Sequence, residues 1–540
     1  TYKYDGSPYY RSPQKSTLND QTSRNLRNLL TASATFDKQF NDHGIKAMVG
    51  YQQEDHRYDM HKGYRENYAF PDYPVLDAGG EENQKAYGNS YEWSLRSIFG
   101  RINYDYQGKY LFEANMRYDG SSRFAEGNKW GIFPSVSAGW RISEEAFWEP
   151  IRNIIDNLKF RASWGQLGNQ NVMNADNSAI DPYPFSSNVN LDTKYIFDKT
   201  ISSGAAITNM ANRKITWETT TSTDIGIDAT LFGKLNITTD YFYKVTDDIL
   251  MKLNVPLIIG MDAPSQNAGK MENRGWEVSL SYADQVGDFN YRASFNISDV
   301  RNKILDMRGV NQTGLTVNRE GHEMYSIYGL EAIGYIQPED YDADGNYLGA
   351  TQYGNFGPGD IKYKDQNGDG VINTSDYKII GGTIPRYTFG LSLYGDYKGF
   401  DLSMLFQGVG KADGYINGQG IQTFIEGGTV QEQHKDYWTP ENRNAKFPRL
   451  AFNETNNMQN SSFWMKNAAY IRLKNVQLGY ALPKNVLRKT PISYLRFYVS
   501  GDNLLTIDSF WDGFDVEAPI GNGGYYPQLK TISFGVDLKF

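Results

Sequence analysis

The 540-residue sequence has no cysteine, so it forms no disulfide bond and offers no thiolate ligand to a metal. It has no run of 18 apolar residues, and its mean hydropathy of −0.60 excludes helical membrane spans. Histidine is scarce, with five residues and no His-pair metal motif, and no glycine-rich phosphate loop follows a strand and opens a helix. A net charge of −9 argues against a nucleic-acid surface. These absences give little support to an enzyme and none to a nucleic-acid-binding protein.

Aromatic residues are abundant instead, at 14% of the sequence with 40 tyrosines. Tyr and Trp favour membrane–water interfaces, where one edge of the ring is apolar and the other is wet. Residues 531–540 alternate strictly between apolar and small or polar side chains, which predicts a strand with one apolar and one wet face. Such a strand has about the length needed to cross a bilayer at a tilt. A β-barrel needs no long apolar run, because its lipid-facing and lumen-facing residues alternate.

The same alternation recurs along the whole chain and predicts further strands, many of them joined by tight turns such as residues 107–109. Residues 1–22 and 58–90 are predicted to be loops, and residues 144–155 a short helix. A phase slip near Lys474 and Asn475 predicts a β-bulge. The predicted strands are 30–37, 45–51, 98–106, 110–118, 136–142, 158–164, 225–231, 235–243, 276–282, 289–297, 387–397, 400–406, 471–482, 495–499 and 531–540.

Short and long connections alternate between these strands, as in outer-membrane barrels with tight periplasmic turns and long external loops. The count is about 15 strands, or about 17 if residues 300–382 hold two more, one of them at 325–336. Either total is odd, and an up-and-down bacterial barrel needs an even number to close. The chain also opens with Thr1 and shows no signal peptide. We therefore expect a processed product or a piece of a longer protein, with missing strands upstream of Thr1.

A series of motifs then follows in one order along nearly the whole chain. They are RYDGSSRF at 117–124, FPSVSAGWRI at 133–142, GQLGNQ at 165–170, WETT at 217–220, NAGKMENRGWE at 267–277, GDIKYKDQNGDG at 359–370, PRYTFG at 385–390, YIRLKNVQLGYALP at 470–483 and SGDNLL at 500–505. With the terminal Phe540, these motifs resemble the C-terminal half of the barrel of SusC-like TonB-dependent outer-membrane transporters of Bacteroidetes.

The resemblance implies an all-β fold, a transmembrane antiparallel up-and-down barrel of about 22 strands with long external loops. It also implies an N-terminal plug, a TonB box and often a carboxypeptidase-regulatory-like domain. Residues 1–540 would be the C-terminal part of the TonB-dependent receptor β-barrel domain, without the plug, the TonB box and the first strands. The implied partners are the upstream part of the same barrel, the TonB complex through that missing part, a SusD-like surface lipoprotein, outer-membrane lipid, and a second copy in a dimer of transporter–lipoprotein pairs.

The implied function is import of oligomeric nutrients across the outer membrane, with energy from TonB and with glycans as the leading substrate class. Oligopeptides are the alternative substrate within the same family. A different role would be a barrel without transport, which serves as an adhesion or assembly scaffold and uses its loops as the binding surface. A plug and a TonB box upstream of Thr1 would decide for the importer. We expect no catalytic residues and no nucleic-acid partner.

Residues 365–376 place oxygen-bearing groups at the spacing of an EF-hand-type calcium loop, with Gly370 at loop position 6. The pattern departs at position 12, where Asp376 replaces the longer Glu that usually binds through both oxygens. The alternative is an Asn-Gly-Asp-Gly turn that needs no metal. The predicted ligands of Ca²⁺, the one cofactor the sequence suggests, are Asp365, Asn367, Asp369, the Val371 carbonyl, Asn373 and Asp376.

The long connection at residues 408–463 carries aromatic side chains among Gly, Asn, Gln and Glu. Aromatic faces with amide and carboxylate neighbours suit sugar rings. The alternative is that these rings pack the small core of the loop itself. The predicted substrate-binding residues are Tyr415, Phe424, Tyr437 and Trp438.

Overall fold

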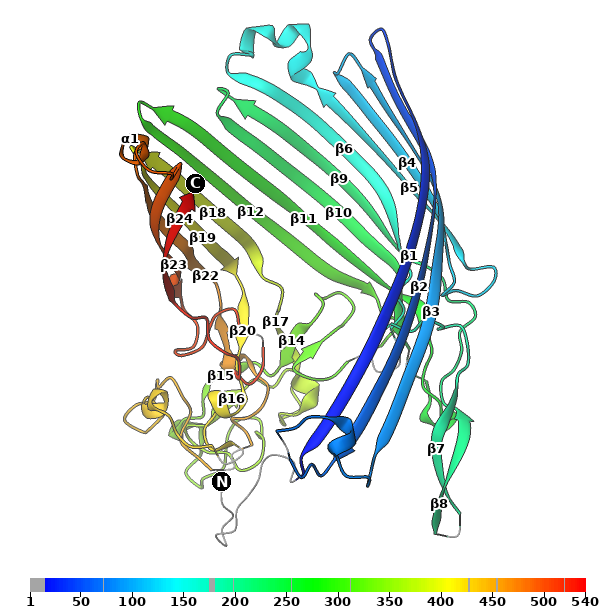
Figure 1. The fold of residues 1–540 in the computed structure, drawn as a ribbon. Coiled ribbons are helices and arrows are strands. Elements are labelled where there is room, and N and C mark those ends of the chain that lie inside the picture. The colour runs from blue at the N-terminus through cyan, green and yellow to red at the C-terminus, as the bar shows by residue number, and fades with distance from the viewer. Residues whose placement is uncertain are drawn as a thin grey trace.

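The computed structural model describes residues 15–70, 72–173, 180–197, 199–253, 255–310, 312–425, 428–452, 455–518 and 520–540. In these residues a single antiparallel sheet of 15 strands curves into an open wall (Figure 1). The strand order is β1-β2-β3-β4-β5-β6-β9-β10-β11-β12-β18-β19-β22-β23-β24, so each strand pairs with the next wall strand in the sequence. The prediction of an all-β, up-and-down membrane wall of about 15 strands is confirmed.

The wall strands are β1 Thr17–Phe40, β2 His43–Glu66, β3 Lys85–Tyr106, β4 Tyr110–Ser121, β5 Trp130–Arg141, β6 Ile155–Asn169, β9 Glu218–Leu231, β10 Leu235–Lys252, β11 Ser265–Val286, β12 Phe289–Asp306, β18 Arg386–Tyr397, β19 Phe400–Lys411, β22 Tyr470–Ala481, β23 Tyr494–Asp508 and β24 Thr531–Lys539. The smaller sheets comprise β7 Val189–Phe197 with β8 Thr200–Ile207, β13 Thr316–Val317 with β14 Ser326–Gly329 and β17 Lys378–Gly381, β15 Ala332–Tyr335 with β16 Ile361–Tyr363, and β20 Asp413–Tyr415 with β21 Met465–Asn467.

In the residues that the structure describes, helical structure is confined to short segments. They include α1 (Lys484–Leu487) and the 3-10 helices η2 (Ile142–Glu144), η3 (Ala146–Ile151) and η6 (Thr374–Asp376). Within the described part of the chain, no helix has both the length and the apolar character that a membrane crossing requires. The prediction of a short helix at residues 144–155 is wrong, since this stretch holds the end of η2, the whole of η3 and the start of β6.

The register of the sheet separates an apolar face from a polar face. Val536 on β24 pairs with Phe497 on β23, and Leu402 on β19 pairs with Leu478 on β22. Paired residues point to the same side of a sheet, so these apolar side chains form one continuous surface. The alternation within the predicted strands places Val536, Leu538, Phe112 and Leu402 on the lipid-facing side, and these side chains are 56%, 44%, 46% and 37% exposed. Their neighbours Lys539, Asp537, Glu113 and Asp401 lie on the opposite, polar face.

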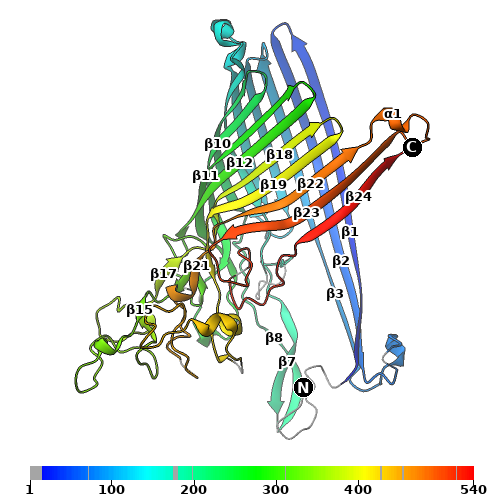
Figure 2. The ribbon, with the colours of Figure 1, turned by 90° about the vertical axis from the view of Figure 1, so that its left-hand side faces the viewer.

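The two ends of the wall differ in the length of their connections (Figure 2). Tight turns join consecutive strands at one end, for example at residues 107–109 between β3 and β4 and residues 232–234 between β9 and β10. The other end carries the long connections and the smaller sheets. Short turns are periplasmic in outer-membrane barrels, so the end with the long connections is external.

Several strands are longer than the sequence predicted. The strands β1 and β2 have 24 residues each, although about ten residues cross a bilayer. Residues 17–22, 58–66 and 85–90, which were predicted to be loops, belong to β1, β2 and β3. Outside the bilayer both faces of a strand are wet, so the apolar alternation that marks the membrane span disappears while the backbone ladder continues.

A β-bulge lies where the phase slip predicts one. Leu473 pairs with Phe406 and Asn475 pairs with Leu405, which leaves Lys474 without a partner on β19. The ladder with β23 is also interrupted at this point, where Leu473 pairs with Leu505 and Asn475 pairs with Asp502. The extra residue lets the apolar side chains before and after Lys474 share the outer face, as a bulge resets the alternation.

The alternative count of about 17 strands is wrong for the described residues. Residues 325–336 divide between β14 and β15, which belong to two small sheets outside the wall. Within the described chain β1 pairs with β2 and β24 pairs with β23, and neither pairs with the other. The expectation that this wall does not close on itself is therefore confirmed.

Candidate functional site

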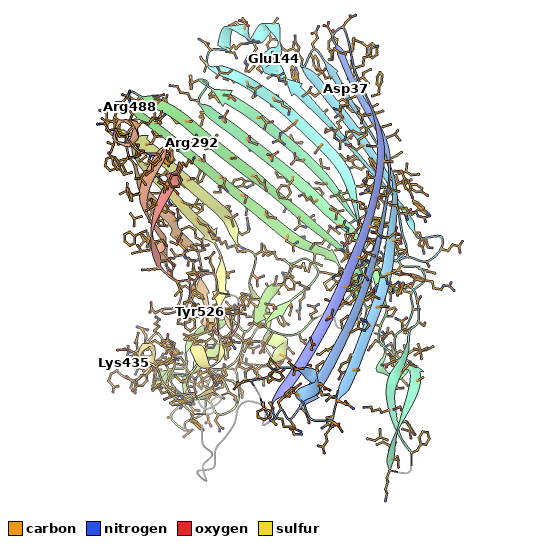
Figure 3. The ribbon with its side chains drawn as sticks, viewed as in Figure 1. Asp37, Glu144, Arg292, Lys435, Arg488 and Tyr526 are labelled. Carbon is orange, nitrogen blue, oxygen red and sulfur yellow. The ribbon has the colours of Figure 1, made fainter. Side chains whose placement is uncertain are left out.

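The polar face of the wall is lined with charged side chains. A hollow of about 500 Å³ lies against strands β1 to β9 on this face. Asp37, labelled in Figure 3, stands at its β1 side. Acidic and basic groups from different strands therefore meet in one water-accessible concavity; its charged lining consists of Asp37, Lys46, Asp105, Glu113, Lys159, Arg161 and Asp224.

An arginine on this face reaches across a whole strand. Arg161 on β6 pairs in register with Gly226 on β9, and Gly226 pairs with Asp240 on β10. The guanidinium passes over the glycine and donates to Asp240 Oδ2 at 2.8 Å, and it also contacts Asp228 at 3.1 Å. A Cβ at Gly226 would lie 2.5 Å from both Arg161 Cζ and Asp240 Oδ1. The glycine is therefore required for close approach of the two charges.

The same arrangement recurs near the C-terminus. Arg496 on β23 donates to both carboxylate oxygens of Asp401 on β19, at 2.8 and 2.6 Å, across the intervening strand β22. Gly479 on β22 lies under the contact, and a Cβ there would come within 2.5 Å of Asp401 Oδ2. Arg496 also donates to Gln477 on β22 and to Asp537 on β24, each at 2.9 Å, so one side chain of β23 is linked to three other strands through charge-assisted hydrogen bonds.

The external connections fold into a compact cluster with a core of its own. Its centre holds the fully buried rings of Trp464 and Trp511, whose centroids lie 6.4 Å apart, with Phe447 stacked on Trp511 at 5.7 Å. We call this assembly the external loop cluster. Its buried apolar residues come from connections that are distant in sequence and from the external ends of β19 and β22: Ile327, Leu330, Ile361, Tyr363, Ile372, Val409, Tyr415, Ile416, Ile421, Phe447, Trp464, Ala468, Tyr470, Phe510, Trp511 and Val516.

A buried carboxylate ties this cluster together. The side chain of Asp360 is fully buried and accepts two hydrogen bonds from the Arg449 guanidinium, both at 2.7 Å. It also accepts from Asn457 Nδ2 and from the backbone N–H of Gly357, each at 2.8 Å. A buried charge is tolerated when it is paired and its lone pairs are filled, and Asp360 meets both conditions.

A second charged junction attaches the connection between β23 and β24 to the rim of the wall. Arg472 on β22 has 3% of its side chain exposed and donates to Asp515 at 2.9 Å. It also contacts Glu517, which accepts from the hydroxyl of Tyr470 at 2.7 Å. The external loop cluster is therefore fixed to the wall by a buried arginine that pairs with two partly exposed carboxylates.

The predicted substrate-binding residues lie in the external loop cluster but in different settings. Tyr415 and Trp438 are buried, at 1% and 5% exposure, and Ser461 N donates to the Tyr415 hydroxyl at 3.2 Å. Phe424 is half-buried with its ring centroid 6.0 Å from that of Phe452, and Tyr437 is also half-buried. Tyr415 belongs to the core of the external loop cluster and Tyr437 packs against that core, and the role of the four rings in binding substrate stays a prediction.

The predicted calcium loop is an ordered turn. Asp365 accepts from the backbone N–H groups of Gly368 and Gly370 at 2.7 and 2.9 Å, and these bonds, the one from Gly370 foremost, lower the pKa of its carboxyl. Asp376 is buried and accepts from the backbone N–H groups of Gln366 and Asn373. Its two oxygens are thus already engaged at the loop position where calcium would need them.

Carboxylates in the rest of the described chain do not form an alternative metal site. No group of three or more His, Asp or Glu side chains in the described ranges is placed to hold an ion. Beside the predicted calcium loop, Glu331 accepts from Lys378 Nζ at 2.8 Å and from Gln366 at 2.9 Å, which holds the pKa of its carboxyl at about 2. The calcium prediction stays a prediction.

Sequence reasoning missed the charged residues that organise the site. Asp360 lies inside the motif at 359–370, but its partner Arg449 is 89 residues away, and no local pattern links them. Gly226 and Gly479 carried a weak signal, because an isolated glycine inside a strand often marks a close approach.

The family model described as TonB dependent receptor-like, beta-barrel matches residues 1–504. TonB-dependent receptor P3 of Formosa agariphila is 31% identical over 555 residues, which cover 96% of this chain and 53% of that protein. TonB-dependent receptor P26 of the same organism is 32% identical over 477 residues, with 83% and 46% covered. TonB-dependent receptor SusC of Bacteroides thetaiotaomicron is 28% identical over 477 residues, with 83% and 44% covered. The chain spans about half the length of these curated relatives.

Solved structures show the same fold. The RagAB peptide importer in its closed-closed state has a TM-score of 0.79 and 25% identity, and the match covers 97% of this chain and 56% of that one. In the open-open state the TM-score is 0.82 with 23% identity, over 99% of this chain and 56% of that one.

Proposed function

Because the chain belongs to the family of TonB-dependent receptor β-barrels, we propose that it forms the wall of an outer-membrane importer of oligomeric nutrients. The observation that carries the proposal is the two-faced sheet, with a continuous apolar face outside and an ion-paired polar face inside. Large barrels of this kind enclose an aqueous lumen that a plug fills, rather than a core of apolar side chains. The family consists of outer-membrane transporters and not of enzymes.

The rest of the proposed importer would complete the barrel. Among the described residues, β1 and β24 each present an edge with no neighbouring strand, and backbone groups on such an edge cannot stay unsatisfied in lipid. We infer that strands and a plug from the other half of the protein fill these positions, and that TonB supplies energy through that half. The length of the curated relatives, about twice that of this chain, supports the inference.

The external loop cluster supports the proposal that a partner protein binds at the outer surface. It is large, has its own aromatic core and is fixed by Asp360 and Arg472, which a bare pore would not require. Rigid loops on a scaffold are where binding surfaces are usually found. The proposed partner is a SusD-like surface lipoprotein that rests on this cluster.

Glycans are the proposed substrate class. Two strongly exposed rings in the external connections offer apolar faces to sugar rings: Phe452, between β19 and β22, at 72%, and Tyr526, labelled in Figure 3, at 82%. Amides lie close in sequence, as Asn522 and Gln528 flank Tyr526, and such groups fix the orientation of a bound ligand. Oligopeptides are the second candidate, and the observation that favours them is the likeness to the RagAB peptide importer.

The test compares growth of a deletion strain on oligosaccharides and on oligopeptides as sole nutrient sources. The strain is complemented with the native gene, with a Phe452→Ala, Tyr526→Ala variant, and with a control variant, Tyr73→Ala, that removes an exposed ring from the connection between β2 and β3. Glycan import predicts that deletion abolishes growth on oligosaccharides alone, and that the double variant, unlike the control, restores it poorly.

Each other outcome has a meaning. Loss of growth on oligopeptides alone would transfer the proposal to peptide import. Unchanged growth on both nutrients, together with purification from mild detergent without a lipoprotein, would contradict import and favour the adhesion or assembly scaffold.

A further inference from the structure

The periplasmic connection between β5 and β6 exposes apolar side chains. It contains η2 and η3 and leads directly into β6 (Figure 1). Phe147 is 64% exposed, Ile151 is 39% exposed and Ile154 is 45% exposed. Three large apolar groups within eight residues form a patch that a solvated turn does not need.

This connection is attached to the outer face of the wall. Tyr110 on β4 pairs in register with Trp140 on β5, and their rings stack at 6.4 Å on the same face as Phe112. Glu145 Oε1 accepts from the Tyr110 hydroxyl at 2.6 Å and from Trp140 Nε1 at 3.2 Å. Glu145 immediately precedes η3, so these bonds hold η3 beside the aromatic rings at the periplasmic rim of the lipid-facing surface.

The exposure of Phe147 is imposed by its neighbours. The adjacent Trp148 is buried, and its Nε1 donates to the carbonyl of Ile155 at 3.0 Å. Arg152 donates to the carbonyl of Ser143 at 2.7 Å and so closes the connection on itself. Because the Trp148 ring fills the packed side of the connection and these two hydrogen bonds fix the backbone around it, the adjacent Phe147 ring points to the exposed side.

A neighbouring turn adds a fourth apolar group at a conformational cost. Phe232, between β9 and β10, is 60% exposed, and its N–H donates to the carbonyl of Ile154 at 2.9 Å. Its φ is +55°, a left-handed conformation that is unfavourable for a bulky side chain. Gln107 and Lys398 take the same conformation in equivalent turns, so the turn itself does not require an aromatic residue.

We propose that Phe147, Ile151, Ile154 and Phe232 insert into the phospholipid of the inner leaflet and anchor this side of the wall at the membrane interface. We call them the periplasmic anchor. Phospholipid is the proposed occupant because the patch continues the lipid-facing surface past Trp140, and the charged groups at this junction, Lys109 and Glu145, are paired with each other, with Glu145 also bonded to Tyr110 and Trp140. A short helix with an apolar side and a charged side lies naturally in this boundary, and Glu149 and Arg152 supply the charged side.

The test uses single nitroxide labels on cysteines introduced at Phe147 and Ile151, in the protein reconstituted into vesicles of phosphatidylethanolamine and phosphatidylglycerol. This chain has no cysteine of its own to compete for the label. Glu149→Cys, from the same helix, is the aqueous control, and Met116→Cys, from the outer face of β4, is the lipid reference. We expect labels at 147 and 151 to collide preferentially with oxygen, like 116, and the label at 149 to collide preferentially with a water-soluble nickel chelate.

Two results would overturn the proposal. A label at 147 that follows the nickel pattern of 149 would place the patch in water, and a label shielded from both reagents would place it against protein. Phe147→Trp provides a second measurement without a label, since brominated phospholipid should quench the added tryptophan and leave the tryptophan of Glu149→Trp largely unquenched. Equal quenching of the two variants would also contradict the anchor.

Discussion

The crossing of Arg496 over Gly479 makes a quantitative prediction about the stability of the wall. In Gly479→Ala the new methyl group would sit within 2.5 Å of both Arg496 Nε and Asp401 Oδ2, so the guanidinium must lift away from β19. The variant loses the two hydrogen bonds to Asp401 but keeps the contact with Asp537. Hydrogen bonds between charged groups contribute about 1.5–3 kcal/mol each, and side chains that are 11% and 17% exposed are only partly relieved by water. We expect a loss of about 2–3 kcal/mol in the free energy of unfolding.

The measurement is urea unfolding in phospholipid vesicles, followed by tryptophan fluorescence and by heat-modifiable mobility on gels. The control is Gly100→Ala, where the added Cβ meets only Met48 O at an ordinary 3.5 Å. A cycle with Asp401→Asn isolates the interaction, because Gly479→Ala should cost much less once the carboxylate charge is gone. If Gly479→Ala and Gly100→Ala unfold at the same urea concentration, the crossing contributes nothing and the argument is wrong.

Three further predictions test the lipid face, the loop charges and the metal. Leu402→Arg should lower the free energy of unfolding in vesicles by about 2–4 kcal/mol if the site is near mid-bilayer, and a Leu402→Ile control should change it little. Because the pKa of Glu331 is depressed, its carboxylate stabilises the external loop cluster above about pH 4.5, and this contribution is lost as the pH falls toward 2. The rate of proteolysis of the native protein should therefore rise over this pH range, and the rate for Glu331→Gln should change less. An identical pH profile for the two proteins would refute the role. If residues 365–376 bind calcium, millimolar Ca²⁺ should slow proteolysis of this loop in the native protein and not in Asp369→Ala, with the wall folded in both; equal cleavage with calcium and with chelator would leave only a turn.

Much of the wall could be predicted from the sequence, because membrane strands carry a local signal. In β24, the polarity of each residue indicates which face of the sheet its side chain occupies. The same alternation, interrupted once, predicted the bulge at Lys474. The rule fails where water lies on both sides. The outer halves of β2 and β3 pair residue by residue, for instance Lys62 with Tyr87, and still read as polar loops. Backbone hydrogen bonding continues in these outer halves, but no alternation of apolar residues indicates it in the sequence.

The candidate site was harder to predict, because its contacts join distant residues. Nothing near Asp360 shows that Arg449 will neutralise it, and nothing near Arg161 shows which of several aspartates it will reach. The aromatic residues illustrate the opposite difficulty. Tyr415 and Trp438 lie in a stretch whose composition suits a sugar-stacking surface. Both rings are buried instead, because large rings remove the most apolar area from water when the external loops pack.

The two charged systems differ in what they allow the molecule to do. Arg161 and Arg496 lie on the polar face of the wall, partly in contact with water, and their links brace neighbouring strands there. Asp360 is fully buried, and removing Arg449 would leave its charge unpaired in an apolar core, at a cost of about 3–5 kcal/mol. That cost falls on two connections at once, because Asp360 lies between β12 and β18 while Arg449 and Asn457 lie between β19 and β22. The cluster should therefore move or unfold as one body, while the wall beneath it keeps its register.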